Sequence, residues 1–201
     1  MTLELSKMSL RKFLCLLTAV ALALLIGCSS TGSLTTQKLD PLTAVTITFT
    51  ESPLVFYHDQ SGRAAHARDY IHMAPLEVNR GGTYRYFFWL GIWNTQQDSQ
   101  TGGPRDGFES IVVIADGEPK VLELSGWTAA SVGASEPIYL KPVASSSDAY
   151  YEVTADYLRL LAESKDIRIR SSGARGASYE PWDNQEGALT SLRKFVRDVR
   201  Y

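Results

Sequence analysis

The chain has 201 residues, of which 44% are apolar and 21% are charged, and its formal net charge at pH 7 is -2. A chain of this length forms one globular domain with short accessory segments, and the apolar fraction suffices for a buried core. The nearly balanced charge argues against a general electrostatic attraction to nucleic acid, so we expect no nucleic-acid partner.

The first 28 residues have the order of features found in an export signal. Basic residues at 11 and 12 precede an apolar run over 13–26, and the signal is well formed whether translation starts at Met1 or at Met8. The apolar run is shorter than the roughly 20 residues that a membrane-spanning helix needs. It ends in Leu25-Ile26-Gly27-Cys28, a motif that resembles the lipobox of bacterial lipoproteins.

The resemblance to bacterial lipoproteins implies that residues 1–27 are a signal peptide, cut between Gly27 and Cys28. Cys28 then becomes the N-terminus and carries acyl chains such as palmitate, which hold the protein on a membrane of the cell envelope. In this class an aspartate after the cysteine usually means retention in the inner membrane, so Ser29 favours the outer membrane, facing the periplasm. The alternative is an uncleaved signal anchor that ends in Gly-Cys.

Residues 28–40 are polar and contain few apolar side chains, so we expect a flexible tether there. A single β-rich globular domain is expected over 41–201. The only other cysteine, Cys15, lies inside the signal, so the mature chain has no thiol pair for an internal disulfide.

Alternation of apolar and polar residues predicts many short strands in this domain. Val45, Ile47 and Phe49, for example, alternate with threonines. Asn79-Arg80-Gly81-Gly82 and Asp116-Gly117 separate two pairs of these runs and predict hairpin turns. The expected strands are 42–50, 54–58, 70–78, 83–93, 110–115, 120–124, 138–141, 150–153 and 167–170.

Two segments have the pattern of helices. Thr154 is a suitable N-cap for a helix over 155–164. The segment 185–200 has an apolar stripe at helical spacing, formed by Leu189, Leu192, Phe195, Val196 and Val199. The sequence therefore predicts a mainly β (α+β) fold, an antiparallel β-sandwich or open barrel with a short helix and a C-terminal amphipathic helix.

The expected strand 83–93 is apolar on both faces and so needs cover on both. One interpretation is a ligand-binding face, on which Trp89 and Trp93, with Trp127, stack on a sugar ring or an apolar ligand. The other is structural, and we expect it: the final helix packs on the face that carries Phe87, Trp89 and Trp93. The basic residues Arg193, Lys194 and Arg197 then face solvent, or they meet anionic headgroups or an acidic partner.

His58, His66 and His72 fall in one stretch, but their spacing matches no compact metal-ligand motif, so we expect no metal and no cofactor. Common hydrolase and nucleotide-binding motifs are absent from the sequence, although a triad assembled from distant loops would leave no such motif. We therefore expect a non-enzymatic interaction or assembly module, bound to the membrane by its lipid and partnered by an envelope protein. The alternatives are a periplasmic ligand-binding module that uses the aromatic strand and a metal-dependent or hydrolytic enzyme.

Overall fold

The computed structural model describes residues 35–60, 67–95, 105–173 and 176–199. These residues form ten strands, one 3-10 turn and two helices. In chain order they are β1 Thr35–Asp40, β2 Val45–Thr50, β3 Leu54–Asp59, β4 Arg68–Arg80, β5 Thr83–Asn94, β6 Ser110–Ala115, β7 Glu118–Gly126, η1 Ala129–Val132, β8 Ser147–Val153, α2 Ala155–Glu163, β9 Ile167–Ser171, β10 Ser178–Pro181 and α3 Glu186–Asp198.

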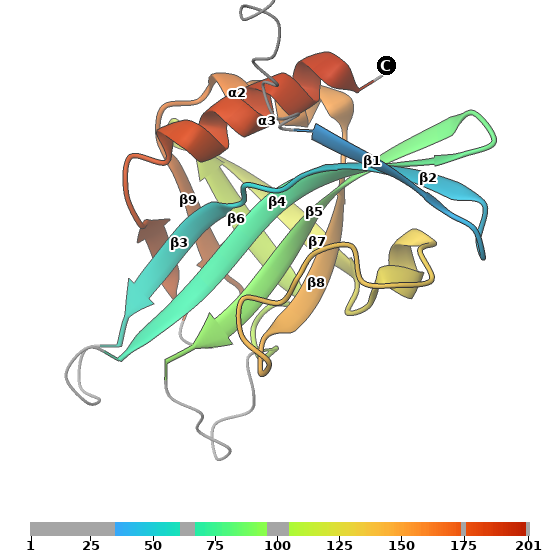
Figure 1. The fold of residues 1–201 in the computed structure, drawn as a ribbon. Helices are drawn as coiled ribbons and strands as arrows, with labels where there is room; N and C mark the ends of the chain where they lie inside the picture. Colours follow the sequence, from blue (N-terminus) through green and yellow to red (C-terminus); the bar gives the residue numbers. More distant parts are fainter. Residues whose placement is uncertain (1–34, 61–66, 96–104, 174–175, 200–201) are drawn as a thin grey trace, which may run out of the picture. The chain divides into compact units, whose positions relative to one another are not determined.

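Eight of the strands close an antiparallel barrel in the order β4-β3-β10-β9-β6-β7-β8-β5, and β5 pairs back onto β4 (Figure 1). The predicted mainly β fold with a C-terminal helix is confirmed, as a closed barrel. Strands β1 and β2 lie outside this ring. Strand β4 is 13 residues long, and β3 pairs with its first half while β2 pairs with its second half. The hairpin of β1 and β2 therefore extends the sheet beyond the barrel.

Both predicted hairpin turns are confirmed. Gly81 and Gly82 have φ values of +58° and +93°, and Asp116 and Gly117 have +50° and +91°. Two successive residues with positive φ match the right-handed twist of the paired strands, which explains why glycine occupies three of the four positions. The predicted cap is confirmed as well, because the Thr154 side chain accepts a hydrogen bond from the backbone N–H of Tyr157.

The buried apolar side chains form two separate hydrophobic cores. The first fills the barrel and is closed at one end by α2 and α3, with Phe88, Tyr151 and Phe195 fully buried. The second lies on the outer face of β2, β4, β5 and β8, under the segment 129–139. Alternate residues of β5 enter alternate cores, so the expectation that this strand is covered on both faces is confirmed.

The expected position of the final helix was wrong. Leu192 and Phe195 of α3 pack in the first core, on the face of β5 opposite to Phe87 and Trp89. The Phe87 and Trp89 face is covered instead by the segment 129–139, where the rings of Trp89 and Tyr139 are stacked with centroids 4.4 Å apart. Residues 138–141, expected to be a strand, form no strand, and of these only Ile138 and Tyr139 belong to the cover.

Tyr139 closes an irregularity between β2 and β3. Phe49 at the end of β2 pairs with Leu76, and Leu54 at the start of β3 pairs with Met73. The four residues 50–53 between these pairs therefore lie opposite only two residues of β4, Ala74 and Pro75. The Tyr139 hydroxyl donates to the Pro75 carbonyl over 2.7 Å. This bond satisfies a buried backbone acceptor at the point where β4 changes partners.

The predicted tether extended too far along the chain, because Thr35–Asp40 form strand β1. This strand is held by pairing with β2 and by the carboxylate of Asp40, a residue that is 4% exposed. The carboxylate accepts hydrogen bonds from the backbone of Leu42, Thr43 and Ser135 and from the Ser135 hydroxyl. Polar bonding therefore orders a segment that apolar burial alone would not.

The remaining sequence-based expectations for the N-terminus lie outside the described residues. These are the signal, Gly27, Cys28 and residues 28–34. Within the described ranges, no helix has the length and apolar character required to cross a membrane.

Candidate functional site

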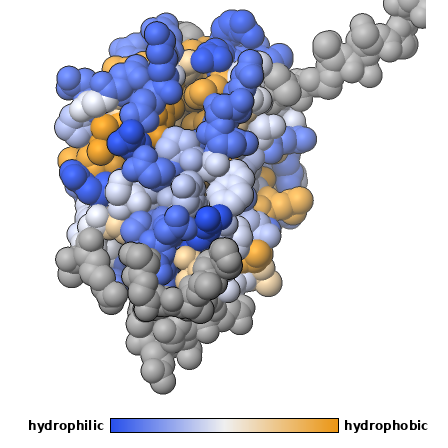
Figure 2. Space-filling view, turned by 90° about the vertical axis from the view of Figure 1, so that its left-hand side faces the viewer, coloured by the Kyte–Doolittle hydropathy of each residue, from blue (hydrophilic) through white to orange (hydrophobic). Residues whose placement is uncertain are grey.

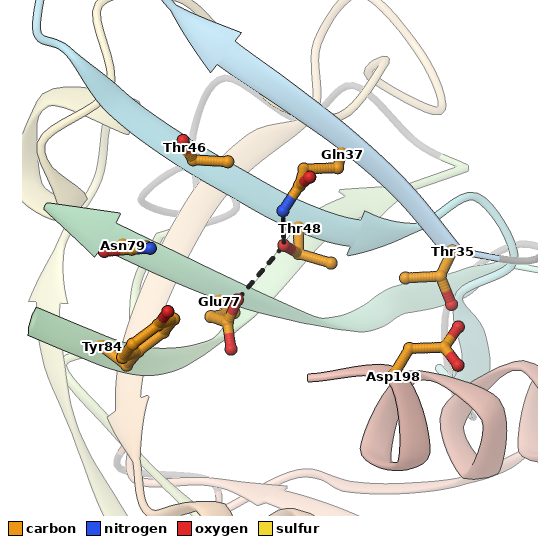
Figure 3. A pocket seen from close by; sticks show the side chains of 8 residues that line it. All are labelled: Thr35, Gln37, Thr46, Thr48, Glu77, Asn79, Tyr84 and Asp198. Atoms are coloured by element: carbon orange, nitrogen blue, oxygen red, sulfur yellow. Dashed lines mark hydrogen bonds between the residues drawn. The ribbon is translucent and has the colours of Figure 1, made fainter. Parts of the chain in front are cut away.

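An open pocket of about 450 Å³ lies where the β1–β2 hairpin, the outer part of β4, the start of β5 and the end of α3 meet (Figure 3). Every described residue that lines it carries a polar group. They are Thr35, Gln37, Thr46, Thr48, Glu77, Asn79, Tyr84 and Asp198.

Strand alternation explains why the lining is polar. On β2, Val45 and Ile47 enter the second core, so Thr46 and Thr48 point to the opposite face. On β4, Leu76 and Val78 do the same, which turns the two side chains between and after them, Glu77 and Asn79, toward the pocket. The inner face of the sheet becomes polar where these strands extend past the barrel.

Strand register places the pocket side chains in two rows across the sheet. Gln37 is opposite Thr48, and Thr48 is opposite Glu77. In the second row Thr46 is opposite Asn79, and Asn79 is opposite Tyr84. Side chains directly opposite on neighbouring strands lie about 4.5–5.5 Å apart at Cβ, so each row offers closely spaced polar groups.

The first row is a directed chain of hydrogen bonds (Figure 3). Gln37 Nε2 donates to Thr48 Oγ1 over 3.4 Å, and the Thr48 hydroxyl donates to Glu77 Oε1 over 3.2 Å. Because the single hydroxyl proton of Thr48 is used toward Glu77, the chain runs from the amide to the carboxylate. Gln37 Oε1 remains an acceptor on the pocket wall.

The second row supplies donors to the pocket. The Asn79 Oδ1 atom accepts a hydrogen bond from Gly82 N over 2.9 Å, within the hairpin turn. This bond fixes the side-chain orientation and leaves the Asn79 amide nitrogen on the pocket side (Figure 3). The hydroxyls of Thr46 and Tyr84 lie in the same row and can donate or accept.

Asp198 forms the wall that α3 contributes. Its Oδ2 atom accepts from Lys194 Nζ over 2.9 Å, and this bond lowers the pKa of the carboxyl, with a further contribution from the Thr35 hydroxyl. Asp198 is therefore a charged acceptor at neutral pH. Among the described lining residues there are two carboxylates and no lysine or arginine.

The three tryptophans of the alternative, ligand-binding interpretation do not form a shared face. Trp89 is 2% exposed, its Nε1 donates to Asp148 over 3.0 Å, and its ring is already stacked on Tyr139. Trp93 stacks on Tyr70, with ring centroids 4.4 Å apart. Trp127 packs against the first core, beneath the Arg105 guanidinium. Trp89 lies inside the second core, where no ligand has access to its ring.

Sequence reasoning did not anticipate an aromatic cluster that surrounds Trp93 and Tyr70. Tyr57 and Trp182 meet edge to face at 5.5 Å, Tyr70 lies 5.6 Å from Trp182, and the Arg68 guanidinium sits 5.1 Å from Tyr57 and 5.2 Å from Trp182. Strand β10 has only two residue pairs with β3, Glu180 with Tyr57 and Pro181 with Phe56. The cluster therefore reinforces one of the seams of the barrel that have only two residue pairs. The face seen in Figure 2 shows hydrophobic side chains in separate patches among hydrophilic ones.

The two described histidines, His58 and His72, lie in different environments. His58 Nδ1 lies 2.9 Å from the Ser178 carbonyl, and burial lowers the pKa of His72. His66 lies outside the described residues. Over the described ranges, no three His, Cys, Asp or Glu side chains are grouped as a metal ion would require.

Comparisons with protein-family models, with curated proteins and with solved structures give no match. This pocket was not identified from the sequence. Its signals were the alternating threonines of β2 and one acidic residue, Glu77, within an otherwise apolar strand.

Proposed function

We propose that this protein is a lipid-anchored envelope protein whose barrel binds a small, uncharged, hydroxyl-rich ligand, such as a sugar ring, in the polar pocket. The observation that carries the proposal is the pair of polar rows across β1, β2, β4 and β5. Binding sites for small molecules depend on a few fixed polar groups, and here the strand register holds them in place.

The chemistry of the lining favours a neutral ligand. Sugar hydroxyls both donate and accept, and the pocket offers donors from Asn79 and Tyr84 beside acceptors from Gln37 and Asp198. A phosphate or carboxylate ligand would instead face the Asp198 carboxylate, which accepts hydrogen bonds but cannot donate one, and the described lining includes no lysine or arginine.

The substitution Asn79→Asp tests the proposal with little change of shape. The aspartate retains an oxygen for the Gly82 N–H, but it replaces the pocket donor with a carboxylate oxygen, which can only accept. We expect a loss of affinity of about tenfold or more, because one hydrogen bond contributes roughly 0.5–1.5 kcal/mol and an unmatched polar contact costs more. Calorimetric titration with a panel of neutral mono- and disaccharides measures it.

Asn184→Asp is the matched control. Asn184 Oδ1 also accepts from a backbone N–H, that of Glu186, and the residue does not line this pocket. It should leave affinity unchanged. The proposal fails if no sugar in the panel binds the wild-type chain, or if the two aspartate variants bind equally well.

The anchor is tested separately by Cys28→Ala. Acyl chains contribute about 0.8 kcal/mol per buried CH₂ group, so their loss should release the protein from membranes. Fractionation of cells that express the variant is the measurement, with Cys15→Ala as the matched control. Sedimentation of Cys28→Ala with membranes in high salt would contradict the lipid anchor.

Docking to an envelope protein is a second candidate function. It is favoured by large apolar side chains on the surface, since Leu42 is 81% exposed and Leu140 is 94% exposed. Replacement of both with serine should abolish co-purification of such a partner from envelopes and leave the melting temperature unchanged. Unaltered co-purification would exclude these two side chains as the docking surface.

A further inference from the structure

We infer that the ligand of the polar pocket is carried by the membrane, as the neutral sugar headgroup of a glycolipid. The inference rests on the proposed function, both on the lipid at Cys28 and on the hydroxyl-rich ligand. It adds where that ligand is found and why the protein needs an anchor beside this pocket.

The first step is the position of Thr35. Thr35 is the first residue of β1, and its side chain lines the pocket next to Asp198 (Figure 3). The point at which the chain enters the folded domain is therefore part of the pocket wall. A lipid attached upstream of Thr35 therefore restrains this wall through a short stretch of chain.

The second step is covalent geometry. Seven Cα-to-Cα steps separate Cys28 from Thr35. A fully extended chain spans at most ~3.6 Å per residue, so Thr35 in the pocket wall stays within roughly 25 Å of the acylated N-terminus, whatever the conformation between them. That distance is comparable to the hydrocarbon thickness of a bilayer, about 30 Å. An anchored protein thus keeps this pocket in a thin layer over the headgroups.

The third step is the advantage of that layer. Confinement of a site and its ligand to one surface raises their effective concentration, and weak sugar affinity then becomes sufficient for occupancy. A soluble sugar gains nothing from the anchor. The phosphate of an anionic headgroup has only acceptors and would face the acceptor oxygen of Asp198 with no lysine or arginine in the described lining, whereas the hydroxyls of a neutral sugar headgroup can pair with both the donors and the acceptors of the two rows.

The experiment uses the intact lipidated protein in phosphatidylcholine vesicles, with and without glucosyl-diacylglycerol. The readout is the melting temperature, because a ligand that binds the folded state stabilises it by RT ln(1 + [L]/Kd). A parallel sample receives soluble methyl glucoside at the same total sugar concentration. We expect glycolipid to raise the melting temperature at a sugar concentration at least tenfold below that needed with methyl glucoside.

Two variants make the result specific to the pocket and to the short connection. Asn79→Asp should abolish the glycolipid effect, and Asn184→Asp should retain it. A flexible Gly/Ser insertion of about 20 residues before Thr35 lets the pocket move through a much thicker layer above the membrane. The effective concentration of the glycolipid headgroup at the pocket should then fall several-fold, and the increase in melting temperature with it.

The outcomes separate this inference from the proposed function. If methyl glucoside binds through Asn79 but glycolipid gives no advantage over it, the pocket binds sugar and the membrane-borne ligand is wrong. If neither form stabilises the protein, the inference is overturned, and the titration with the sugar panel decides the proposed function. If the glycolipid effect persists in Asn79→Asp, the lipid binds elsewhere and the inference is overturned.

Discussion

Gly91, in the middle of β5, has no room for even one additional carbon atom. A Cβ built there would lie 2.7 Å from Cη2 and 2.8 Å from Cζ2 of Trp89, and 3.4 Å from Cδ of Pro142. The indole lies over the glycine. It cannot move easily, because it is 2% exposed, stacked on Tyr139 at 4.4 Å and bonded to Asp148 through Nε1.

We therefore expect Gly91→Ala to destabilise the protein. Forced overpacking in a core costs about 1–3 kcal/mol, and displacement of the indole also threatens its bond to Asp148. For a domain of this size, 1 kcal/mol corresponds to about 2–4 °C in melting temperature. The expected decrease is then roughly 2–12 °C. Thermal unfolding, followed by circular dichroism of the full chain, measures it.

Gly187 provides a matched glycine. It lies near the start of α3, and a Cβ built there has no neighbour within 4 Å. Gly187→Ala should be neutral or stabilising by up to about 1 kcal/mol, because alanine favours helix. Reduction of the overlapping ring in Trp89→Leu should make the alanine at 91 less costly, a coupling of about 0.5–3 kcal/mol between contacting sites. Equal melting temperatures for the two alanine variants would refute this reasoning.

Three further substitutions test other parts of the fold. The pKa of Asp40 is held well below its ordinary value of 3.8, chiefly by the Ser135 N–H, so its stabilising effect is complete above pH 3.8 and declines as the pH falls below it. Asp40→Asn should lower the urea midpoint of unfolding at pH 7, and this difference from wild type should be smaller at pH 3. An equal difference at the two pH values would contradict the role of the Asp40 charge. Phe195→Ala should cost about 3–5 kcal/mol of unfolding free energy if α3 closes the barrel, and a loss below about 1 kcal/mol would show that it does not. Trp182→Ala should speed amide hydrogen exchange in β10 more than in β4, because it removes aromatic and cation–π contacts of about 0.5–1.5 kcal/mol each at the seam; unchanged exchange in β10 would mean that strand pairing alone holds it.

Features set by a few neighbouring residues could be read from the sequence. The turns at Gly81-Gly82 and Asp116-Gly117, the cap at Thr154 and the apolar alternation of most strands are of this kind. Each depends on local backbone preference or on the period-two pattern, which the sequence states directly. The observed turn is shorter than the predicted segment 79–82, because Arg80 already pairs with Thr83, and this two-residue turn sets the register that stacks Tyr70 on Trp93.

The segment that covers the Trp89 face of β5 could not be predicted from local sequence patterns. The sequence indicated that both faces need cover, and it offered one amphipathic helix for the Trp89 face. It contained no sign that residues 129–139, rich in small and polar residues, would provide that cover through Tyr139. An aromatic ring in a loop can cover a strand without any periodicity, so the choice between helix and loop depended on tertiary packing.

The pocket was decided by tertiary structure alone. Alternating threonines in 45–50 indicated a polar face of β2, but a polar face is usually solvated. Only the pairing of β2 with the outer half of β4, and of β1 with β2, aligns Gln37, Thr48 and Glu77 in one row. That pairing depends on the irregularity at Pro75, where β4 exchanges β3 for β2. Register between strands distant in sequence is fixed by such contacts and not by the composition of either strand, so the site became visible only in the folded chain.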